Sequence, residues 1–407
     1  MRILNLCVAV IFALILSYFL PVFANLFLPE YKIYDRVRYS PLVKDFLFST
    51  LNKKENTQVY EVAGGERIDE DTFMRYQPFT YYSLLIPKGK FPSEFRKYED
   101  NVTLIIKNSQ SLNLRQGFNE TRYIPLYPVL DVEPKFGKVI YSPFLIKLAA
   151  QRLEVVDARR NGEDVVVSSQ LNEELKKAGF KHGAKAYFLN PSIMKGFDEG
   201  GFLIDSDDKI FHLKFKDGKF SAVDTKIKKP GIVNIVVIEN ERREFYAVLI
   251  AKDGLGLISY DNYAYVPLPS VGYDYAASDL YLKITPEYKM LAFSDEEAIY
   301  TYVTNLKYEL EKQNFTRASK PISDRALKRY VFPFEAHIAQ KEGAYRFEFK
   351  NFAPQSVFAS LILAFAFFAY NLRFYKRRAI LESAFVLIFG IYGFIAMIFY
   401  NTDKGKI

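Results

Sequence analysis

Long apolar runs lie at both ends of the chain, and most charged residues lie between them. Residues 3–29, 351–372 and 383–402 contain no Asp, Glu, Lys or Arg. Each run reaches the roughly 20 residues that a helix needs to cross a bilayer core of about 30 Å. In lipid, a helix is the way for a single segment to satisfy its own backbone hydrogen bonds. The pattern therefore predicts three transmembrane helices, one within residues 1–30 and a hairpin of two within residues 351–402.

The first run has two possible fates. Val22-Phe23-Ala24 is typical of a signal-peptidase site, which would release a cleaved leader. Apolar character continues past that site to Leu28, which favours an uncleaved signal anchor. We expect the anchor, with the cleaved signal as the alternative.

Basic residues predict the orientation of the membrane segments. The short loop 373–378 between the last two runs carries Arg373, Lys376, Arg377 and Arg378, and such clusters mark the cytoplasmic side. The hairpin tip is then cytoplasmic, and both of its outer ends lie across the membrane with region 31–350. Basic residues just after the first helix favour the opposite orientation, but basic residues are more concentrated in the loop 373–378. We expect a multi-pass protein of the bacterial inner membrane with a periplasmic main domain.

The exported region 31–350 is long enough for two lobes. We expect a mixed α+β lobe over residues 31–180. Residues 100–106 read as a strand, and 153–156 with 164–167 read as strands joined at an Asn-Gly hairpin turn. Residues 169–180 read as a helix that Gly179 ends.

The lobe over residues 181–350 is richer in strands. A strand, a tight acidic turn and a second strand recur at 201–213, 247–259 and 290–301. The spacing matches one four-stranded propeller blade, about 40–45 residues. A small propeller and an open stack of antiparallel sheets fit this pattern equally. The fold class is therefore a membrane-anchored, mainly β (α+β) domain.

Composition removes several classes of protein. Hydrophobic residues make up 50% of the chain and charged residues 25%, which is unlike a disordered protein. A single cysteine, Cys7, rules out a disulfide framework and cysteine-based zinc sites. The net charge of +8 is compatible with binding to nucleic acid or to anionic lipid. Because topology explains the strongest basic cluster, we expect the lipid bilayer as a partner and no nucleic acid.

Motifs for catalysis are weak. Gly254-Leu255-Gly256 lacks the third glycine and the helix of a nucleotide loop and reads as a hairpin turn. The acidic run 205–208 resembles the start of a calcium loop, but Lys216 stands where the bidentate Glu belongs. His212 alternates within a strand and fits a structural role better than that of a base. We expect no cofactor and no metal, and the catalytic residues stay unknown.

Tyrosines gather on one Pro/Gly-rich connection. Tyrosine buries area with little entropy loss, so such a segment favours a contact surface for a partner. Simple strand packing is an equal alternative. The tyrosines of this possible partner surface are Tyr260, Tyr263, Tyr265, Tyr273 and Tyr275.

One sequon has an extended form. Asn101-Val102-Thr103 is an N-glycosylation acceptor, and Glu99 lies two positions before the asparagine. Bacterial oligosaccharide transfer favours that acidic residue. Asn101 is therefore a candidate glycosylation site.

Several short motifs together resemble a known family. They are Phe197-Asp198-Glu199-Gly200-Gly201-Phe202, Ile204-Asp205, Phe211-His212-Leu213-Lys214, Phe79-Thr80-Tyr81-Tyr82 and Ile124-Pro125-Leu126-Tyr127-Pro128. They resemble the bacterial membrane-protein family known as domain of unknown function 4857. The resemblance implies a membrane protein and no established activity, and it suggests a transporter component as partner.

These features favour a non-enzymatic accessory or sensing subunit of a transporter or envelope complex. The C-terminal hairpin is longer than anchoring requires, because one helix already tethers the chain. The alternative is an envelope hydrolase with a site between the two lobes, and a structural scaffold is a third possibility.

Overall fold

The computed structural model describes residues 2–27, 29–115, 125–133, 137–149, 152–181, 183–320, 322–323, 325–341, 344–375 and 379–401. The chain forms two compact units. The membrane unit comprises Met1–Tyr34, Thr50–Gln58 and Ser319–Ile407, and the sheet unit comprises Asp35–Ser49 and Val59–Ala318. The boundary expected near residue 180 falls inside the sheet unit.

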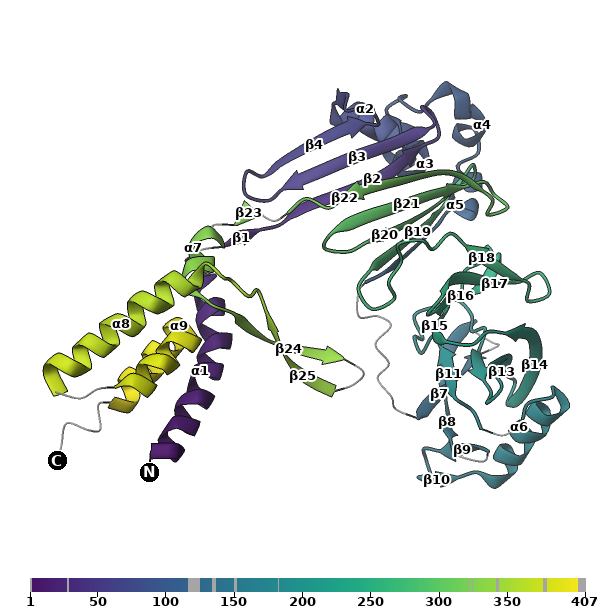
Figure 1. Ribbon diagram of the computed structural model, residues 1–407. Coiled ribbons are helices and arrows are strands. Elements are labelled where there is room, and N and C mark those ends of the chain that lie inside the picture. The colour runs from purple at the N-terminus through teal and green to yellow at the C-terminus, as the bar shows by residue number, and fades with distance from the viewer. Residues whose placement is uncertain are drawn as a thin grey trace. The chain divides into compact units, whose positions relative to one another are not determined.

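Antiparallel sheets recur along the chain (Figure 1). Four of them have four strands and one has five, and their hydrogen-bonded orders are β2-β3-β4-β5, β10-β9-β8-β7, β11-β12-β13-β14, β15-β16-β17-β18 and β22-β21-β20-β19-β6. The strands are β2 (Ile33–Ser40), β3 (Asp45–Asn52), β4 (Thr57–Val62), β5 (Arg67–Ile68), β6 (Gln110–Leu114), β7 (Leu126–Glu133), β8 (Lys138–Leu148), β9 (Leu153–Asp157), β10 (Gly162–Glu163), β11 (Ala186–Leu189), β12 (Gly201–Ile204), β13 (Lys209–Lys216), β14 (Lys219–Lys228), β15 (Ile232–Val237), β16 (Phe245–Ala251), β17 (Gly254–Ser259), β18 (Tyr265–Leu268), β19 (Asp279–Ile284), β20 (Lys289–Ser294), β21 (Ala298–Thr304) and β22 (Leu310–Arg317).

The three predicted strand–turn–strand repeats are confirmed. They are the antiparallel pairs β12–β13, β16–β17 and β20–β21, each inside a larger antiparallel sheet. Among the described strands no sheet closes on itself. The sheet pairing thus gives no support to the propeller expectation, and the protein is β-rich with additional helices.

Neighbouring sheets share cores, so the central ones are buried on both faces. Val248 on β16 packs in one cluster with Leu282 on β19. Its neighbour Leu249 points to the opposite face and packs with Phe202 on β12. Burial on both faces explains why residues 247–251 are uninterrupted apolar residues rather than an alternating pattern.

Short helices cover the first part of the sheet unit. The predicted strand over 100–106 is wrong, because those residues lead into a helix. Its β-branched residues favour a strand, but Ile105 inserts fully into a core with Phe79 and Tyr98, and that packing outweighs local propensity. These helices are α2 (Glu70–Arg75), α3 (Pro78–Leu85), the 3-10 helix η1 (Ser93–Phe95), α4 (Arg96–Glu99) and α5 (Val102–Asn108).

The hairpin predicted at Asn161 is confirmed, since β9 pairs with β10 and Asn161 has φ 48°. The strand predicted at 164–167 is wrong. Asp164 accepts a hydrogen bond from the Val167 amide at 3.1 Å and caps helix α6 (Val165–Lys177), which therefore begins before residue 169. Gly179 follows the helix with φ +89°, as predicted.

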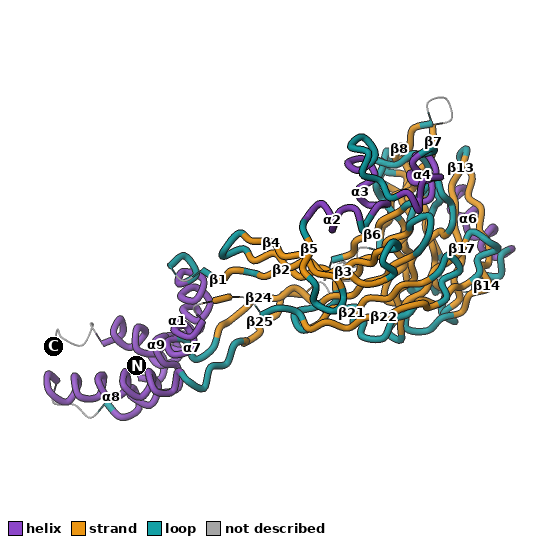
Figure 2. The backbone as a smooth tube through the Cα atoms, turned by 90° about the horizontal axis from the view of Figure 1, so that it is seen from above, coloured by secondary structure: helices purple, strands orange, loops and turns teal. Residues whose placement is uncertain are grey.

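The membrane unit contains the apolar helices. Three of its helices are long and apolar enough to cross a membrane, over Cys7–Ala24, Ser356–Phe374 and Ile380–Phe399, where the sequence predicts them. They lie side by side in Figure 2, and small residues Ala9, Ala13 and Ala396 allow close packing in their shared core. Its elements are α1 (Arg2–Ala24), β1 (Glu30–Tyr31), β23 (Ile322–Ser323), α7 (Arg325–Val331), β24 (Glu335–Lys341), β25 (Ala344–Lys350), α8 (Ser356–Tyr375) and α9 (Ile380–Asn401).

Helix α9 is broken rather than straight. Gly390 has φ 55° and ψ −132°, outside the helical region. A Cβ on Gly393 would lie 3.0 Å from the Phe385 carbonyl oxygen and 3.2 Å from Val386 Cα. In a straight helix residues seven apart are separated by about 10 Å along the axis. The two halves of α9 therefore fold back on each other at Gly390.

The second half of α9 runs antiparallel to α1. The Tyr392 ring stacks on Phe332, just after α7, with centroids 5.9 Å apart. Helix α7 lies at the end of α1 where β1 begins (Figure 1). The Phe399 ring lies 5.8 Å from Phe12, halfway along α1. The chain after Gly390 thus heads back toward the level at which α1 starts.

Candidate functional site

A glycine pair positions the acidic motif of residues 197–202. Gly200 has φ +77°, and a Cβ there would overlap the carbonyl oxygen of Leu213. A Cβ on Gly201 would lie 2.6 Å from the Phe188 carbonyl oxygen. Only glycine allows this close approach of three backbones, so Glu199 is held at the start of β12 against β13.

Glu199 is the centre of a charged cluster. Its side chain is buried, and Lys214 Nζ lies 2.5 Å from its Oε2. The Arg243 guanidinium lies 3.9 Å from Oε1. The Glu199 carboxylate thus has a basic side chain near each of its two oxygens.

His212 lies beneath this cluster and is uncharged. Its ring is 1% exposed and stacks on Phe202 at 4.4 Å. Nε2 lies 2.6 Å from the Glu199 carbonyl oxygen, and Nδ1 lies 3.0 Å from the Tyr263 hydroxyl. A carbonyl can only accept, so Nε2 carries the proton and Nδ1 accepts from Tyr263. Burial, together with the charge of Lys214, lowers the pKa of His212 to about 3, which fits the predicted structural role.

Three tyrosines stack beside His212. The ring of Tyr246 is 3.7 Å from Tyr260 and 5.1 Å from Tyr263, nearly parallel to both. Lys214 Nζ lies 5.2 Å from the centre of the Tyr246 ring, within cation–π distance. Burial raises the pKa of Tyr260 and of Tyr263, and the negative charge of Glu199 adds to both shifts. The cluster offers aromatic faces and hydroxyl donors next to one carboxylate.

The five tyrosines of the predicted partner surface are distributed over several places. Tyr260 and Tyr263 lie together in the His212 cluster. Tyr265 lies over Gly256 on β17. Tyr273 and Tyr275 pack against the core between β16 and β19. The role of these five residues as a partner surface stays a prediction.

A buried ion triad lies next to this cluster. Lys195 Nζ lies 2.6 Å from Asp198 Oδ1 and 2.6 Å from Glu239 Oε1, and all three side chains are at most 7% exposed. Asn190 donates to the second oxygen of Glu239 at 2.7 Å. Sequence reasoning missed the triad. Lys195 three residues before Asp198 is a local signal, but Glu239 follows β15, which belongs to the next sheet along the chain.

A second cluster joins the two predicted lobes. Lys283 on β19 is 8% exposed, and its Nζ donates to Thr80 Oγ1 on α3 at 2.7 Å. Burial, with the like charge of Arg38, lowers the pKa of Lys283 to about 8. Arg38 itself lies over the Tyr281 ring at 4.6 Å. Sequence reasoning missed this pair, although Thr80 belongs to a motif singled out above.

The candidate glycosylation site and one of the basic residues predicted to set the topology lie among the described residues. Asn101 is exposed just before α5, and Arg373 lies in the last turn of α8. Lys376, Arg377 and Arg378 lie outside the described residues. Across the described part of the chain, no three His, Cys, Asp or Glu side chains converge closely enough to hold a metal.

These features define a class, a protein with apolar helices at both chain ends and stacked antiparallel sheets between them. The family described as "Domain of unknown function (DUF4857)" matches residues 36–304, so the chain belongs to it, as the motifs suggested. No curated protein sequence matches the chain.

Two solved structures show distant similarity. The dihydro-heme d1 dehydrogenase NirN, solved in complex with DHE, is 11% identical with a TM-score of 0.27, covering 71% of this chain and 47% of that one. PorZ, a surface component of the type-IX secretion system of Porphyromonas gingivalis, is 10% identical with a TM-score of 0.22, covering 70% and 32%. This chain thus spans less than half of either structure.

Proposed function

We propose that this protein is a non-enzymatic accessory or sensing subunit of a transporter or envelope complex in the bacterial inner membrane. In this proposal the sheet unit is periplasmic and presents a binding surface. The aromatic cluster around Tyr246, Tyr260 and Tyr263 is the part of that surface with the most specific chemistry. Stacked rings beside a fixed carboxylate suit a partner with a basic or aromatic side chain.

One observation carries the proposal. The sheet unit is continuous with apolar helices on both sides, α1 before it and α8 with α9 after it. Helix α1 and α9 also pack together through Ala9, Ala13 and Ala396. A single helix would tether the domain, so a packed helical unit favours assembly with other membrane components.

The test is purification of the tagged full chain from membranes in mild detergent. We expect a stoichiometric membrane partner in wild type and its loss in Tyr260→Ser. The matched control is Tyr141→Ser, at an exposed tyrosine on β8 that is not part of the aromatic cluster. Recovery of the chain alone from its native membrane would contradict the proposal.

A second candidate is the envelope hydrolase, because Thr80 and Lys283 form a hydroxyl–amine pair. A buried lysine with a lowered pKa can act as general base for a hydroxyl nucleophile. Neutral Lys283 would take the Thr80 proton as Oγ1 attacks an ester or amide carbonyl. It would then protonate the leaving group, and water would release the acyl group from Thr80.

This candidate is tested with a fluorophosphonate probe on the purified full chain. Covalent labelling in wild type and Thr80→Ser, but not in Thr80→Val or Lys283→Met, would support the hydrolase. Ser93→Ala, at an exposed serine, is the control. Wild type that takes up no more probe than Thr80→Val would remove this candidate.

A further inference from the structure

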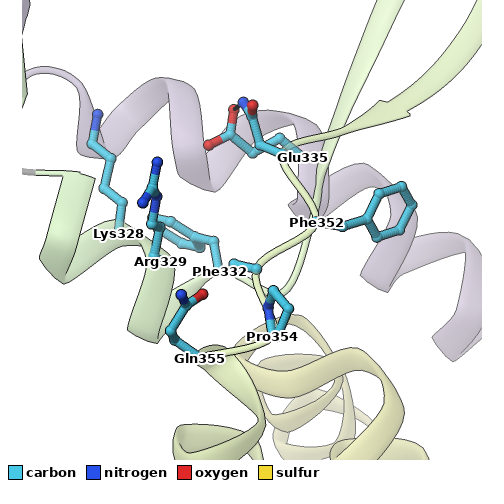
Figure 3. Close-up of a pocket in the computed structure, with 9 residues that line it drawn as sticks. Lys328, Arg329, Phe332, Glu335, Phe352, Pro354 and Gln355 are labelled. Carbon is cyan, nitrogen blue, oxygen red and sulfur yellow. Dashed lines mark hydrogen bonds between the residues drawn. The ribbon is translucent and has the colours of Figure 1, made fainter. Parts of the chain in front are cut away.

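A polar cavity lies in the membrane unit where α8 begins. Its volume is about 340 Å³, and it is lined by the end of α7 and by the segment that leads into α8 (Figure 3). Lys328 and Arg329 come from α7, and Gln355 directly precedes α8. Its size is within the range of small-ligand sites.

The cavity carries a net positive charge. Lys328 is 6% exposed and donates to the Asn25 side chain just past α1, while the Arg329 side chain is exposed. Among the described residues of the lining, the one carboxylate is Glu335, which accepts a hydrogen bond from Asn351 at 2.8 Å. The described lining therefore holds two basic side chains and one carboxylate that is already engaged. The first three N–H groups of α8 donate to the carbonyls of Ala353, Pro354 and Gln355, so α8 contributes the positive end of its dipole rather than free donors.

An apolar surface follows immediately. Along α8, Phe358, Ile362 and Phe365 recur at helical spacing and are 69%, 69% and 73% exposed. Phe358 is three residues from Gln355, about 5 Å along the helix axis. A cationic cavity next to an exposed apolar stripe on a membrane helix matches the two ends of an amphiphile.

We propose that this cavity binds the phosphate headgroup of one anionic phospholipid, with its acyl chains along the exposed face of α8. Lys328 and Arg329 hold the phosphate, and the positive dipole end of α8 adds to their attraction. The lipid, rather than free phosphate, is the occupant, because the apolar stripe adjoins the cavity and belongs to a helix that can cross a membrane. The site is separate from the aromatic cluster and does not depend on the proposed partner function.

The test uses the full chain delipidated in neutral detergent and returned to phosphatidylcholine bilayers with phosphatidylglycerol added. Native mass spectrometry counts the phosphatidylglycerol that stays bound. We expect one retained lipid in wild type and about fivefold weaker retention in Arg329→Gln, since one basic side chain near a membrane contributes about that factor. Lys350→Gln makes the same charge change outside the cavity, on an exposed side chain, and should retain the lipid as wild type does.

A second variant separates binding from folding. Gln355→Glu places a carboxylate at the start of α8. There it interacts favourably with the positive end of the helix dipole, but it repels a phosphate in the cavity. We expect unchanged thermal stability in plain phosphatidylcholine and weaker retention of phosphatidylglycerol. Equal retention in wild type, Arg329→Gln and Gln355→Glu would overturn the proposal. Release of the lipid by inorganic phosphate at constant ionic strength would also overturn it, because the site would then prefer the free anion.

Discussion

Both units use glycine pairs to bring backbones together, but the residues around each pair differ. In the sheet unit, Gly200 and Gly201 let β12 approach its neighbours, and charges buried nearby are paired. In the membrane unit, Gly390 and Gly393 fold α9 back on itself. There the buried polar side chain Asn371 donates to its own helix, to the Phe367 carbonyl at 2.8 Å. In the sheet unit glycine positions the acidic motif, whereas in the membrane unit it reverses the direction of an apolar helix.

The largest expected effect concerns the C-terminus. Each half of α9 has roughly 10 residues and is about 15 Å long, half of a bilayer core. We expect a reporter fused after Ile407 to lie on the same side as one fused after Arg378. Straightening α9 with Gly390→Leu and Gly393→Leu should move the C-terminal reporter across the membrane, because a continuous helix of this length spans the core.

Alkaline phosphatase and green fluorescent protein fusions measure this. A fusion after Lys350 reports the opposite side in wild type and in the variant and serves as the control. Sequence reasoning alone expects both outer ends of the hairpin on the far side. A wild-type C-terminal fusion that matches the Lys350 fusion would therefore restore the straight span and contradict the expected return.

Next in size is the loss of a buried cation from the sheet unit. Lys195→Met leaves Asp198 and Glu239 buried without their shared partner. Breaking such a group lowers the free energy of unfolding by about 3–5 kcal/mol. The matched control is Lys185→Met, which removes an exposed pair with Asp208 and should change stability by less than about 1 kcal/mol. Urea unfolding of the full chain in detergent checks both, and equal losses would refute the importance of burial.

A smaller effect tests the glycine pair itself. Gly201→Ala forces a Cβ to within 2.6 Å of the Phe188 carbonyl oxygen, and such overpacking destabilises by about 1–3 kcal/mol. At Gly196 a Cβ meets nothing within 4 Å, so Gly196→Ala should be neutral or slightly stabilising. The same unfolding experiment compares them. If the two variants have equal stability, β12 does not need the close approach.

The sequence predicts regular elements well where one pattern dominates. Three hairpins follow from apolar runs broken by acidic turns, and the apolar helices follow from length and hydropathy. Prediction fails where packing decides. The region 100–106 is helical because Ile105 enters a distant core, and hydropathy does not register the break at Gly390.

The candidate site is less predictable than the fold, because its residues meet only when sheets stack. Tyr260 and Tyr263 follow β17, whereas His212 belongs to β13 of the preceding sheet. Their proximity depends on how the two sheets pack, which no local spacing encodes. Thr80 and Lys283 are still farther apart in the chain, and neither residue alone has a distinctive motif.

The smallest expected effect is the pH dependence that His212 contributes. Its pKa is about 3 in the folded protein, against 6.5 for an unperturbed histidine. Because only the unfolded chain takes up the proton, the stability is fully present above about pH 6.5 and falls as the pH drops toward 3. Between about pH 6.5 and pH 5.5 the loss is about 1 kcal/mol. His212→Phe keeps an aromatic ring on Phe202 and should remove this pH-dependent loss of stability. It should also lower stability near neutral pH, since Tyr263 and the Glu199 carbonyl lose their hydrogen-bond partner. If stability fell with pH at the same slope in both proteins, His212 would be protonated in the folded cluster as well. His212 would then be a titrating group of the site rather than a structural residue.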